Sequence, residues 1–199
     1  MSVSETFDVY LASGSPRRGE LLEQAGVTFI RTVAPVDESV LDNEEASAYV
    51  ERLAIAKARA GLAQLKSDGL VVKPVLGSDT AVVVDGEILG KPEDYQDFYR
   101  MMTLLSGRSH QVMSGVAVLD DDCQRSVVSI TQVTFIPLSE AQIERYWRTG
   151  EPLDKAGGYG IQGRGGLFVE TMSGSYTGVV GLPLCETADL LEQFNISCR

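Results

Sequence analysis

Apolar residues along the chain alternate between the two-residue period of a strand and the 3.6-residue period of a helix. The segment FDVYLAS predicts a strand, which leads through Gly14 into a helix over PRRGELLEQAG that Gly26 ends. The short apolar segment VTFIRTV follows. Beyond an acidic link, apolar residues recur at helical spacing and predict a long helix from about Ala46 to Leu65.

The next segments predict two pairs of strands. In PVLGSDTAVVVDGEIL, two apolar runs surround Asp85-Gly86, which is a strong hairpin signal. A helix from about Tyr95 to Leu105 separates it from HQVMSGVAVL and SVVSITQVTFIPL, which turn at DDDCQ. Ser139 and Gln142 form a capping-box pattern that opens the helix EAQIERYW.

The last part of the chain contains the glycine-rich stretch DKAGGYGIQGRGG, two short predicted strands, and a predicted helix from about Pro183 to Phe194. Adjacent strand pairs mixed with helices indicate an α/β fold with a mixed sheet. No repeat, low-complexity tract or linker separates independent domains, so residues 1–199 are expected to form one domain.

Composition narrows the class of partner. The 28 acidic and 17 basic residues give a net charge of −11, which repels polyanions and makes nucleic acid and anionic membranes unexpected partners. Cys123, Cys185 and Cys198 have no CxxC spacing and are odd in number, which favours reduced thiols in a cytoplasmic protein. The chain shows neither a basic leader nor a run of 18 apolar residues. Export and a membrane anchor are therefore not expected.

Arg17 and Arg18 stand in the first turn of the first helix, where the helix dipole disfavours cations. A strand that enters a helix through small residues presents free N–H groups, and such groups bind phosphate. Two guanidinium groups beside them suit an arriving anion. The alternative is two solvated arginines on a surface turn.

Asp79 lies in VLGSDTAVVV with apolar residues on both sides. A buried carboxylate costs several kcal/mol unless it is paired, which favours a general base or a cation ligand. The alternative is a strand end that faces water. Lys57 borders the apolar stripe of the long helix, where a lysine that extends its amine to solvent is the simpler interpretation.

Lys91 follows the second strand of the hairpin. With a simple two-residue turn, Lys91 lies opposite Thr80 and Asp79 faces the other side of the sheet. A bulge at Gly90 would bring Asp79 and Lys91 onto one face, and the sequence leaves both arrangements open.

Three other residues merit attention. Glu38, beside Asp37, offers oxygen ligands for Mg²⁺ or Mn²⁺, although an acidic loop is the alternative. Gln162, in the glycine-rich stretch, has an amide that could bond to the edge of a base, although a flexible surface loop is the alternative. His110 is the single histidine and is interpreted as structural.

Seven segments together resemble the Maf family of nucleoside-triphosphate pyrophosphatases: SGSPRR, AIAKARAG, GSDT, GKP, SGRSHQVMSGVAV, DKAGGYGIQG and VVGLPL. The resemblance runs from about Leu11 to Leu184. It implies a fold like that of the inosine-triphosphate pyrophosphatases, with a long mixed β-sheet flanked by helices and two lobes around a cleft. It also implies hydrolysis of a nucleoside triphosphate to the monophosphate and pyrophosphate with a divalent cation, and a homodimer.

The resemblance assigns roles to single residues. Asp79 matches the proton-accepting aspartate, and Asp79 with Glu38 is expected to hold the metal. SPR, GSDT and GIQG are similar to the branch that acts on dTTP and UTP, and differ from the 7-methyl-GTP branch, which has SPW, GSDQ and a serine-glutamate pair. The expected substrate-binding and specificity residues are Arg17, Thr80, Gln162, Ser13, Arg18, Lys57 and Lys91.

The expected reaction is metal-assisted attack of water on the α-phosphorus, with Asp79 as the base. One alternative is a non-catalytic, nucleotide-responsive regulator of septum formation in cell division. Another is an enzyme that acts on a modified pyrimidine nucleotide. The intact GSDT segment and the lysines favour catalysis.

Overall fold

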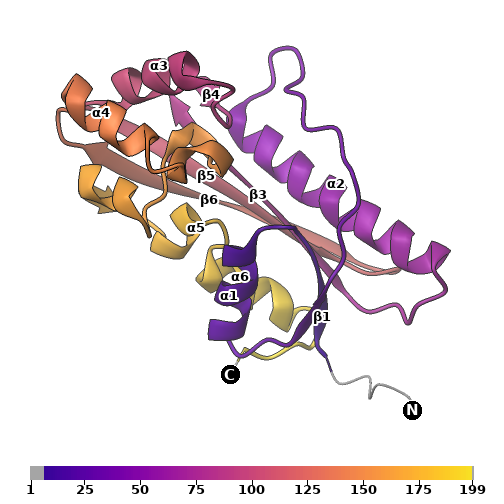
Figure 1. Ribbon diagram of the computed structural model, residues 1–199. Helices are drawn as coiled ribbons and strands as arrows, with labels where there is room; N and C mark the ends of the chain where they lie inside the picture. The colour runs from indigo at the N-terminus through magenta and orange to yellow at the C-terminus, as the bar shows by residue number, and fades with distance from the viewer. Residues whose placement is uncertain (1–6, 199) are drawn as a thin grey trace.

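The computed structural model describes residues 7–198 and contains one mixed seven-stranded sheet (Figure 1). The strand order is β2-β1-β3-β5-β6-β7, and β4 pairs with the edge of β3. The strands are β1 (Val9–Ala12), β2 (Phe29–Arg31), β3 (Val75–Val84), β4 (Glu87–Leu89), β5 (Ser109–Leu119), β6 (Gln124–Phe135) and β7 (Val169–Ser173).

The strands pair in both directions, as the sequence predicts. Strand β1 runs parallel to β2 and β3, whereas β3, β5, β6 and β7 form antiparallel pairs, as do β3 and β4. The helices are α1 (Pro16–Gln24), α2 (Ala46–Ser67), α3 (Tyr95–Leu105), α4 (Glu140–Trp147), α5 (Tyr176–Val180) and α6 (Leu184–Glu192), and the 3₁₀ turns are η1 (Glu151–Asp154), η2 (Ala156–Gly158) and η3 (Arg164–Phe168).

Most of the predicted elements are confirmed. Helix α4 begins with the predicted capping box of Ser139 and Gln142, and the hairpin turns at Asp85-Gly86. Ser15 is the N-cap of α1, although its side chain makes no capping hydrogen bond. The expectation of two short strands after the glycine-rich stretch is wrong, because β7 is followed by helix α5. The Ser175 hydroxyl accepts a hydrogen bond from the Gly178 amide and caps that helix.

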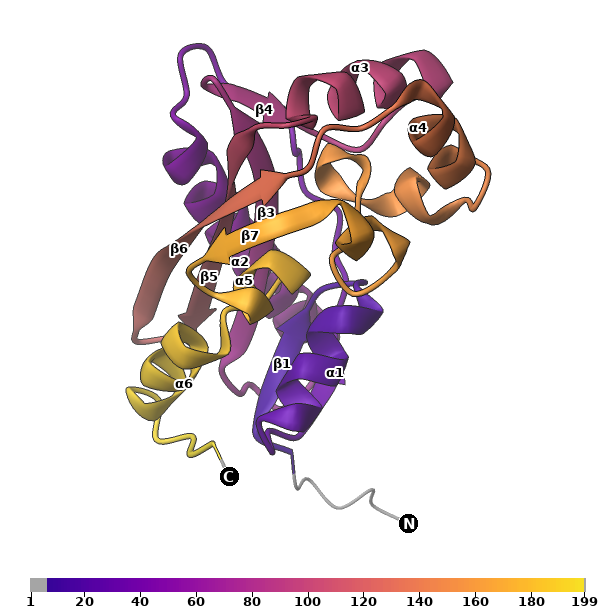
Figure 2. The ribbon, with the colours of Figure 1, turned by 90° about the vertical axis from the view of Figure 1, so that its left-hand side faces the viewer.

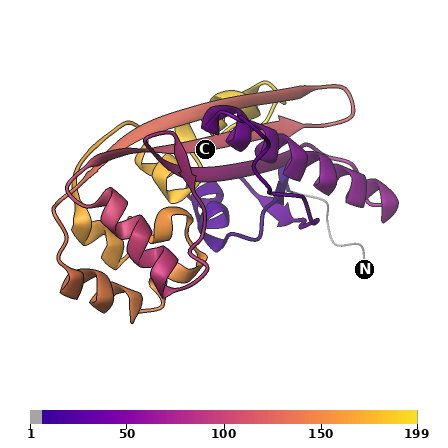
Figure 3. The ribbon, with the colours of Figure 1, turned by 90° about the horizontal axis from the view of Figure 1, so that it is seen from above.

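One face of the sheet is covered by α2, which runs along the long strands (Figure 3). Its close approach depends on two strand glycines. A Cβ atom on Gly77 would lie 2.3 Å from the Ala54 carbonyl oxygen, and one on Gly115 would lie 2.4 Å from the Val50 carbonyl oxygen. Any larger residue there would push the helix away from the sheet.

The opposite face carries two separate apolar clusters. Helices α1 and α6 pack at one end, and α3 and α4 pack at the other (Figure 2). Along β3, Leu76 belongs to the first cluster and Val82 to the second. Between them on the same face are Ser78 and Thr80, so polar positions mark the boundary between the two lobes.

Within residues 7–198, no helix is long and apolar enough to cross a membrane.

Replacement of Gly115 tests the contact between α2 and the sheet. We expect Gly115→Ala to lower the free energy of unfolding by about 1–3 kcal/mol, because the added methyl group meets the Val50 backbone. Urea denaturation measures this change. Gly14→Ala is the control, since no atom lies within 4 Å of a Cβ there. Equal stability of the two variants would contradict the packing argument.

Candidate active site

A cleft of about 950 Å³ lies between the two lobes. The segment after β1, the middle of β3 and the segment that includes Tyr159 and Gln162 all line it. All the residues that the sequence analysis selected as site residues line this one cleft: Ser13, Arg17, Arg18, Glu38, Lys57, Asp79, Thr80, Lys91 and Gln162. Asp37 does not line it, and its carboxylate accepts a hydrogen bond from the Ser39 amide at 2.9 Å.

The cleft lies at a gap in the sheet. Strand β1 pairs with β3 as far as Gly77, and β4 pairs with β3 from Val82 onward. Between these points no strand of the described chain borders that edge of β3, whereas its other edge pairs with β5 throughout. Side chains from both faces of β3 therefore reach the cleft around this open edge.

The gap explains how Asp79 and Lys91 reach the same cleft without a bulge at Gly90. Asp85-Gly86 is a simple two-residue turn, with Val84 paired to Glu87, so the bulge is not needed. Asp79 and Thr80 point to opposite faces of β3, yet both line the cleft together with Lys91.

The Lys57 ammonium group lies between two carboxylates. Its Nζ atom is 2.6 Å from Asp79 Oδ1 and 2.7 Å from Glu38 Oε1. The side chain of Lys57 is only 15% exposed, so the interpretation of a lysine extended to solvent is wrong. Asp79 is buried in the middle of β3, which excludes a strand end that faces water.

Burial separates the pKa values of the two carboxylates. Loss of solvent raises the pKa of Asp79 above its usual value, although Lys57 and Arg18 act in the opposite direction. For Glu38, partial burial is outweighed by Lys57, and the pKa lies below its usual value. Lys91 also lowers the pKa of Glu38, which places its positive charge near that carboxylate. Asp79 is therefore the stronger base of the two.

Arg17 and Arg18 have different surroundings. Arg18 Nε donates to the Gly181 carbonyl at 2.9 Å, and its Nη1 donates to the Ser13 hydroxyl at 3.1 Å. Burial lowers the pKa of Arg18, and nearby Asp79 partly offsets this effect. The guanidinium group of Arg17 instead has one long ion pair in the described chain, at 3.8 Å to the exposed Asp154. Arg17 is thus the arginine that is available to an incoming anion.

A serine that the sequence analysis missed orients Thr80. Ser114, paired with Thr80 across β5 and β3, donates its hydroxyl proton to the Gly178 carbonyl at 2.7 Å. The Thr80 hydroxyl, 2.8 Å from Ser114 Oγ, must then be the donor of that pair. Arg18 Nη2 donates to Thr80 Oγ1 at 3.4 Å, so the Thr80 hydroxyl is held between Ser114 and Arg18.

The cleft residues fit a divalent cation that takes some of its ligands from the protein and the others from substrate phosphates and water. Within residues 7–198, no group of three or more acidic, histidine or cysteine side chains forms a ready metal site. The carboxylates of Asp79 and Glu38 nevertheless lie close together, because both contact the Nζ atom of Lys57. Mg²⁺ typically takes one or two carboxylates and completes its shell with phosphate and water, which matches this donor set.

His110 lies outside the cleft lining and is buried, which agrees with its structural interpretation. Its Nε2 atom is 2.8 Å from the hydroxyl of Tyr159, which lines the cleft. Within the described residues, Nδ1 is buried without a hydrogen-bond partner. Burial lowers the pKa of His110 to about 4, so the imidazole is neutral at physiological pH.

The sequence analysis also missed Glu151, Asp154 and Tyr159, which line the cleft. Asp154 and Glu151 belong to turn η1 and carry no periodic signal. The nearest indication was the glycine-rich stretch, because glycines allow neighbouring groups to approach the backbone.

Comparison with known proteins identifies the family. The family model described as Maf-like protein matches residues 8–194. The chain belongs to the Maf family. It is 56% identical over 194 residues to a protein of Chromobacterium violaceum named dTTP/UTP pyrophosphatase, and the alignment covers 98% of each chain.

Other relatives agree in name. A Vibrio parahaemolyticus protein, also named dTTP/UTP pyrophosphatase, is 50% identical to this Maf-family chain, with coverage of 96% of this chain and 100% of the relative. Among solved structures, the Staphylococcus aureus Ham1 protein aligns with a TM-score of 0.47 and 14% identity, and covers 64% of this chain and 71% of its own. The resemblance to the Maf family that the motifs indicated is confirmed.

The raised pKa of Asp79 has a consequence for stability. Ionisation of Asp79 is less favourable in the folded chain than in the unfolded chain. The charge therefore lowers the free energy of unfolding once the pH exceeds the pKa of Asp79 in the unfolded chain. We expect Asp79→Asn to keep or raise the Tm at pH 7. Lys57→Met leaves two carboxylates without their shared ammonium group and should lower stability by about 3 kcal/mol. A larger loss for Asp79→Asn than for Lys57→Met would refute this order.

The low pKa of His110 predicts sensitivity to acid. Its stabilising effect is fully present above about pH 6.5 and is lost as the pH falls toward about 4. The loss should approach about 3 kcal/mol over that window. Urea denaturation at several pH values measures it, with His110→Gln as the reference. Parallel pH profiles for the two proteins would show that another group is responsible.

Proposed function

We propose that this chain hydrolyses dTTP and UTP to the nucleoside monophosphate and pyrophosphate. The buried Lys57–Asp79 pair at the open edge of β3, inside a cleft that contains further cationic side chains, carries the proposal. Nucleotide pyrophosphatase activity needs a positioned base beside groups that stabilise phosphate charge. The printed names of the relatives point to the thymine and uracil nucleotides.

Cationic groups on opposite sides of the cleft would bind the triphosphate. Arg17 stands at the start of α1, where backbone N–H groups and open space beside Gly14 suit a phosphate. Lys91 faces the triphosphate from the segment after β4. Arg18 is committed to Gly181, Ser13 and Thr80, and its role is to hold this side of the cleft in shape.

Asp79 would act as the general base. Lys57 occupies its Oδ1 atom, and Oδ2 has no hydrogen bond within the described chain. A water molecule at Oδ2 gives its proton to Asp79 while its oxygen forms a bond to the α-phosphorus. The bond from the α-phosphorus to the bridging oxygen breaks, and pyrophosphate leaves with that electron pair.

Glu38 would hold a divalent cation, Mg²⁺ or Mn²⁺, together with the phosphates, and a contact of Asp79 with the cation would compete with its role as the base, because a carboxylate bound to a metal is a poorer base. When bound, the cation would neutralise charge on the triphosphate and so assist the departure of pyrophosphate. Lys57, which contacts both carboxylates, keeps them together before the substrate arrives.

Two residues would select the base. The Gln162 side chain is exposed at the cleft and can meet the adjacent carbonyl and N–H groups of uracil or thymine. Thr80 would shape the pocket, and toward a ligand its hydroxyl could only accept a hydrogen bond, because its proton is donated to Ser114.

Catalysis is favoured over a purely regulatory role in septum formation. Asp79, Lys57 and Glu38 are all present and in contact, and the relatives are named as pyrophosphatases. A modified pyrimidine nucleotide would use the same residues, so a substrate panel must include one.

The domain organisation, the cellular location and the partners are also part of the proposal. We propose that the chain acts as a single domain, since β3 and β5 contribute to both apolar clusters. Free Cys123, Cys185 and Cys198 suit a reducing cytoplasm. Family membership supports a homodimer, and the net charge of −11 disfavours nucleic acid and anionic membranes as partners.

Release of pyrophosphate from a panel of nucleotides tests the activity. We expect turnover of dTTP and UTP with Mg²⁺ or Mn²⁺, and also of 5-methyl-UTP, which presents the same base edge to Gln162, with weaker turnover of CTP and 7-methyl-GTP. Asp79→Asn should lower kcat by about 10²-fold or more, because the base is lost while the shape is kept. Absence of turnover by folded protein would rule out the enzymatic function.

Charge reversal at Arg17 tests phosphate binding. Because Arg17 makes a single long ion pair among residues 7–198, Arg17→Glu should leave the Tm nearly unchanged and raise the KM for UTP by about tenfold or more. Arg31→Glu is not a suitable control, since Arg31 bonds to the Ser13 and Ser15 carbonyls. Arg145→Glu on the exposed face of α4 is suitable. An unchanged KM in Arg17→Glu would remove Arg17 from the phosphate site.

A further inference from the structure

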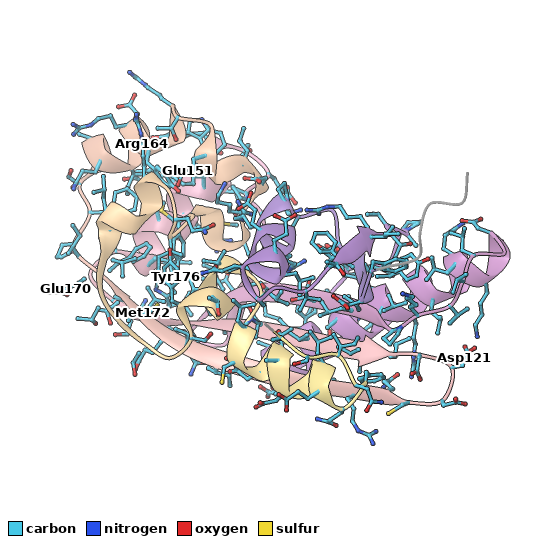
Figure 4. The ribbon with its side chains drawn as sticks, turned by 90° about the horizontal axis from the view of Figure 1, so that it is seen from below. Asp121, Glu151, Arg164, Glu170, Met172 and Tyr176 are labelled. Atoms are coloured by element: carbon cyan, nitrogen blue, oxygen red, sulfur yellow. The ribbon has the colours of Figure 1, made fainter. Side chains whose placement is uncertain are left out.

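The carboxylate of Glu151 lies directly behind the loop that carries Gln162. Its Oε2 atom accepts a hydrogen bond from the Arg164 amide at 2.9 Å, and its Oε1 atom accepts one from the Gly165 amide at 3.1 Å. Glu151 and Arg164 lie beside each other in Figure 4. One side chain thus holds the loop on the C-terminal side of Gln162.

Tyr146 extends the same contact to the N-terminal side of Gln162. Its hydroxyl donates to Glu151 Oε1 at 2.8 Å and accepts from the Gly160 amide at 3.1 Å. Tyr146 is buried on α4 within the apolar cluster of that lobe, so its hydroxyl has a fixed position. The Glu151–Tyr146 pair therefore binds three backbone amides, those of Gly160, Arg164 and Gly165, on the two sides of Gln162.

The glycines of the loop fit this close contact. A Cβ atom on Gly163 would lie 2.4 Å from Glu151 Oε1, and one on Gly165 would lie 2.7 Å from the Tyr146 hydroxyl. Side chains at either position would displace the loop from the pair. The glycine-rich composition is thus explained by the groups behind the loop as well as by access for a ligand.

Gln162 itself depends on this support. Within residues 7–198 its amide makes no hydrogen bond, and its side chain is exposed. Its direction is consequently set by the loop backbone and not by contacts of its own. Hydrogen bonds from Arg164 and Gly165 outweigh partial burial and hold the pKa of Glu151 below its usual value, so the carboxylate is ionised and accepts all its donors at neutral pH.

We propose that the Glu151–Tyr146 pair positions Gln162 for selection of the pyrimidine base. The inference rests on the proposed function, which gives Gln162 its role at the base. Glu151 and Tyr146 are positioning residues: they act on the substrate through the loop backbone. The chemistry at Asp79 stays intact when the pair is disturbed.

The first test is Glu151→Gln, which replaces a carboxylate oxygen by an NH₂ group that cannot accept from the loop amides. We expect the KM for dTTP and UTP to rise about tenfold, and the preference for UTP over CTP to fall by a similar factor. The kcat should stay within about threefold of the natural value, because the base is untouched. Glu144→Gln, on the exposed face of α4, is the matched control and should change neither constant.

Tyr146→Phe provides an independent variant, since it removes only the hydroxyl that links Glu151 to Gly160. It should weaken base selection in the same direction as Glu151→Gln. Because both residues act on one loop, the double variant should lose less than the product of the two single losses. A fall in kcat at unchanged KM, or unchanged base selection in both variants while their Tm values stay normal, would overturn the proposal.

Amide hydrogen exchange separates this proposal from the proposed function, since it needs no substrate. The amides of Gly160, Arg164 and Gly165 should exchange faster in Glu151→Gln than in the natural protein, with no change in Glu144→Gln. If the natural protein hydrolyses no pyrimidine nucleotide, the proposed function fails, and the exchange rates still decide whether Glu151 holds the loop. Unchanged exchange would refute the Glu151–Tyr146 pair as its support.

Discussion

The ammonium group of Lys57 is the contact on which the cleft depends. It brings Asp79 from the sheet and Glu38 from the segment before α2 to one point. Without it, two carboxylates would share a partly buried space, and their repulsion would open it. The lysine can reach this point because α2 lies close against the sheet over Gly77 and Gly115.

The second constraint is the length of the neighbouring strands. Strand β1 ends at Ala12, opposite Gly77, and β4 ends at Leu89, opposite Val82, so neither covers the middle of β3. A cleft at the edge of a strand, unlike one above the face of a sheet, can take side chains from both faces of that strand. This geometry places both Asp79 and the adjacent Thr80 at the cleft, although they lie on opposite faces of the strand.

Local patterns predicted most elements, because caps, turns and periodicity act over a few residues. The prediction of a strand in place of helix α5 was wrong. The β-branched residues Thr177, Val179 and Val180 favour a strand, but Ser175 caps a helix there. The residues that the motifs indicated all line the cleft. The alternation of apolar and polar residues could not predict how these side chains are arranged in space. Whether Asp79 and Lys91 face the same cleft depends on where β1 and β4 stop pairing with β3. Glu151 gave no signal at all, because only the folded chain brings it to the loop amides.

The continuity of β3 and β5 through both lobes limits how the molecule can admit a ligand. Each strand carries core residues of both lobes, and hydrogen bonds join the two strands from Val75 to Val83. A hinge rotation between the lobes would have to bend or break this ladder, which resists it. Entry and exit of a nucleotide therefore fall to the exposed stretch around Glu38, since the loop around Gln162 is held by Glu151 and Tyr146. The rate of product release then becomes a property of this stretch, while the paired strands β3 and β5 support the other residues of the cleft.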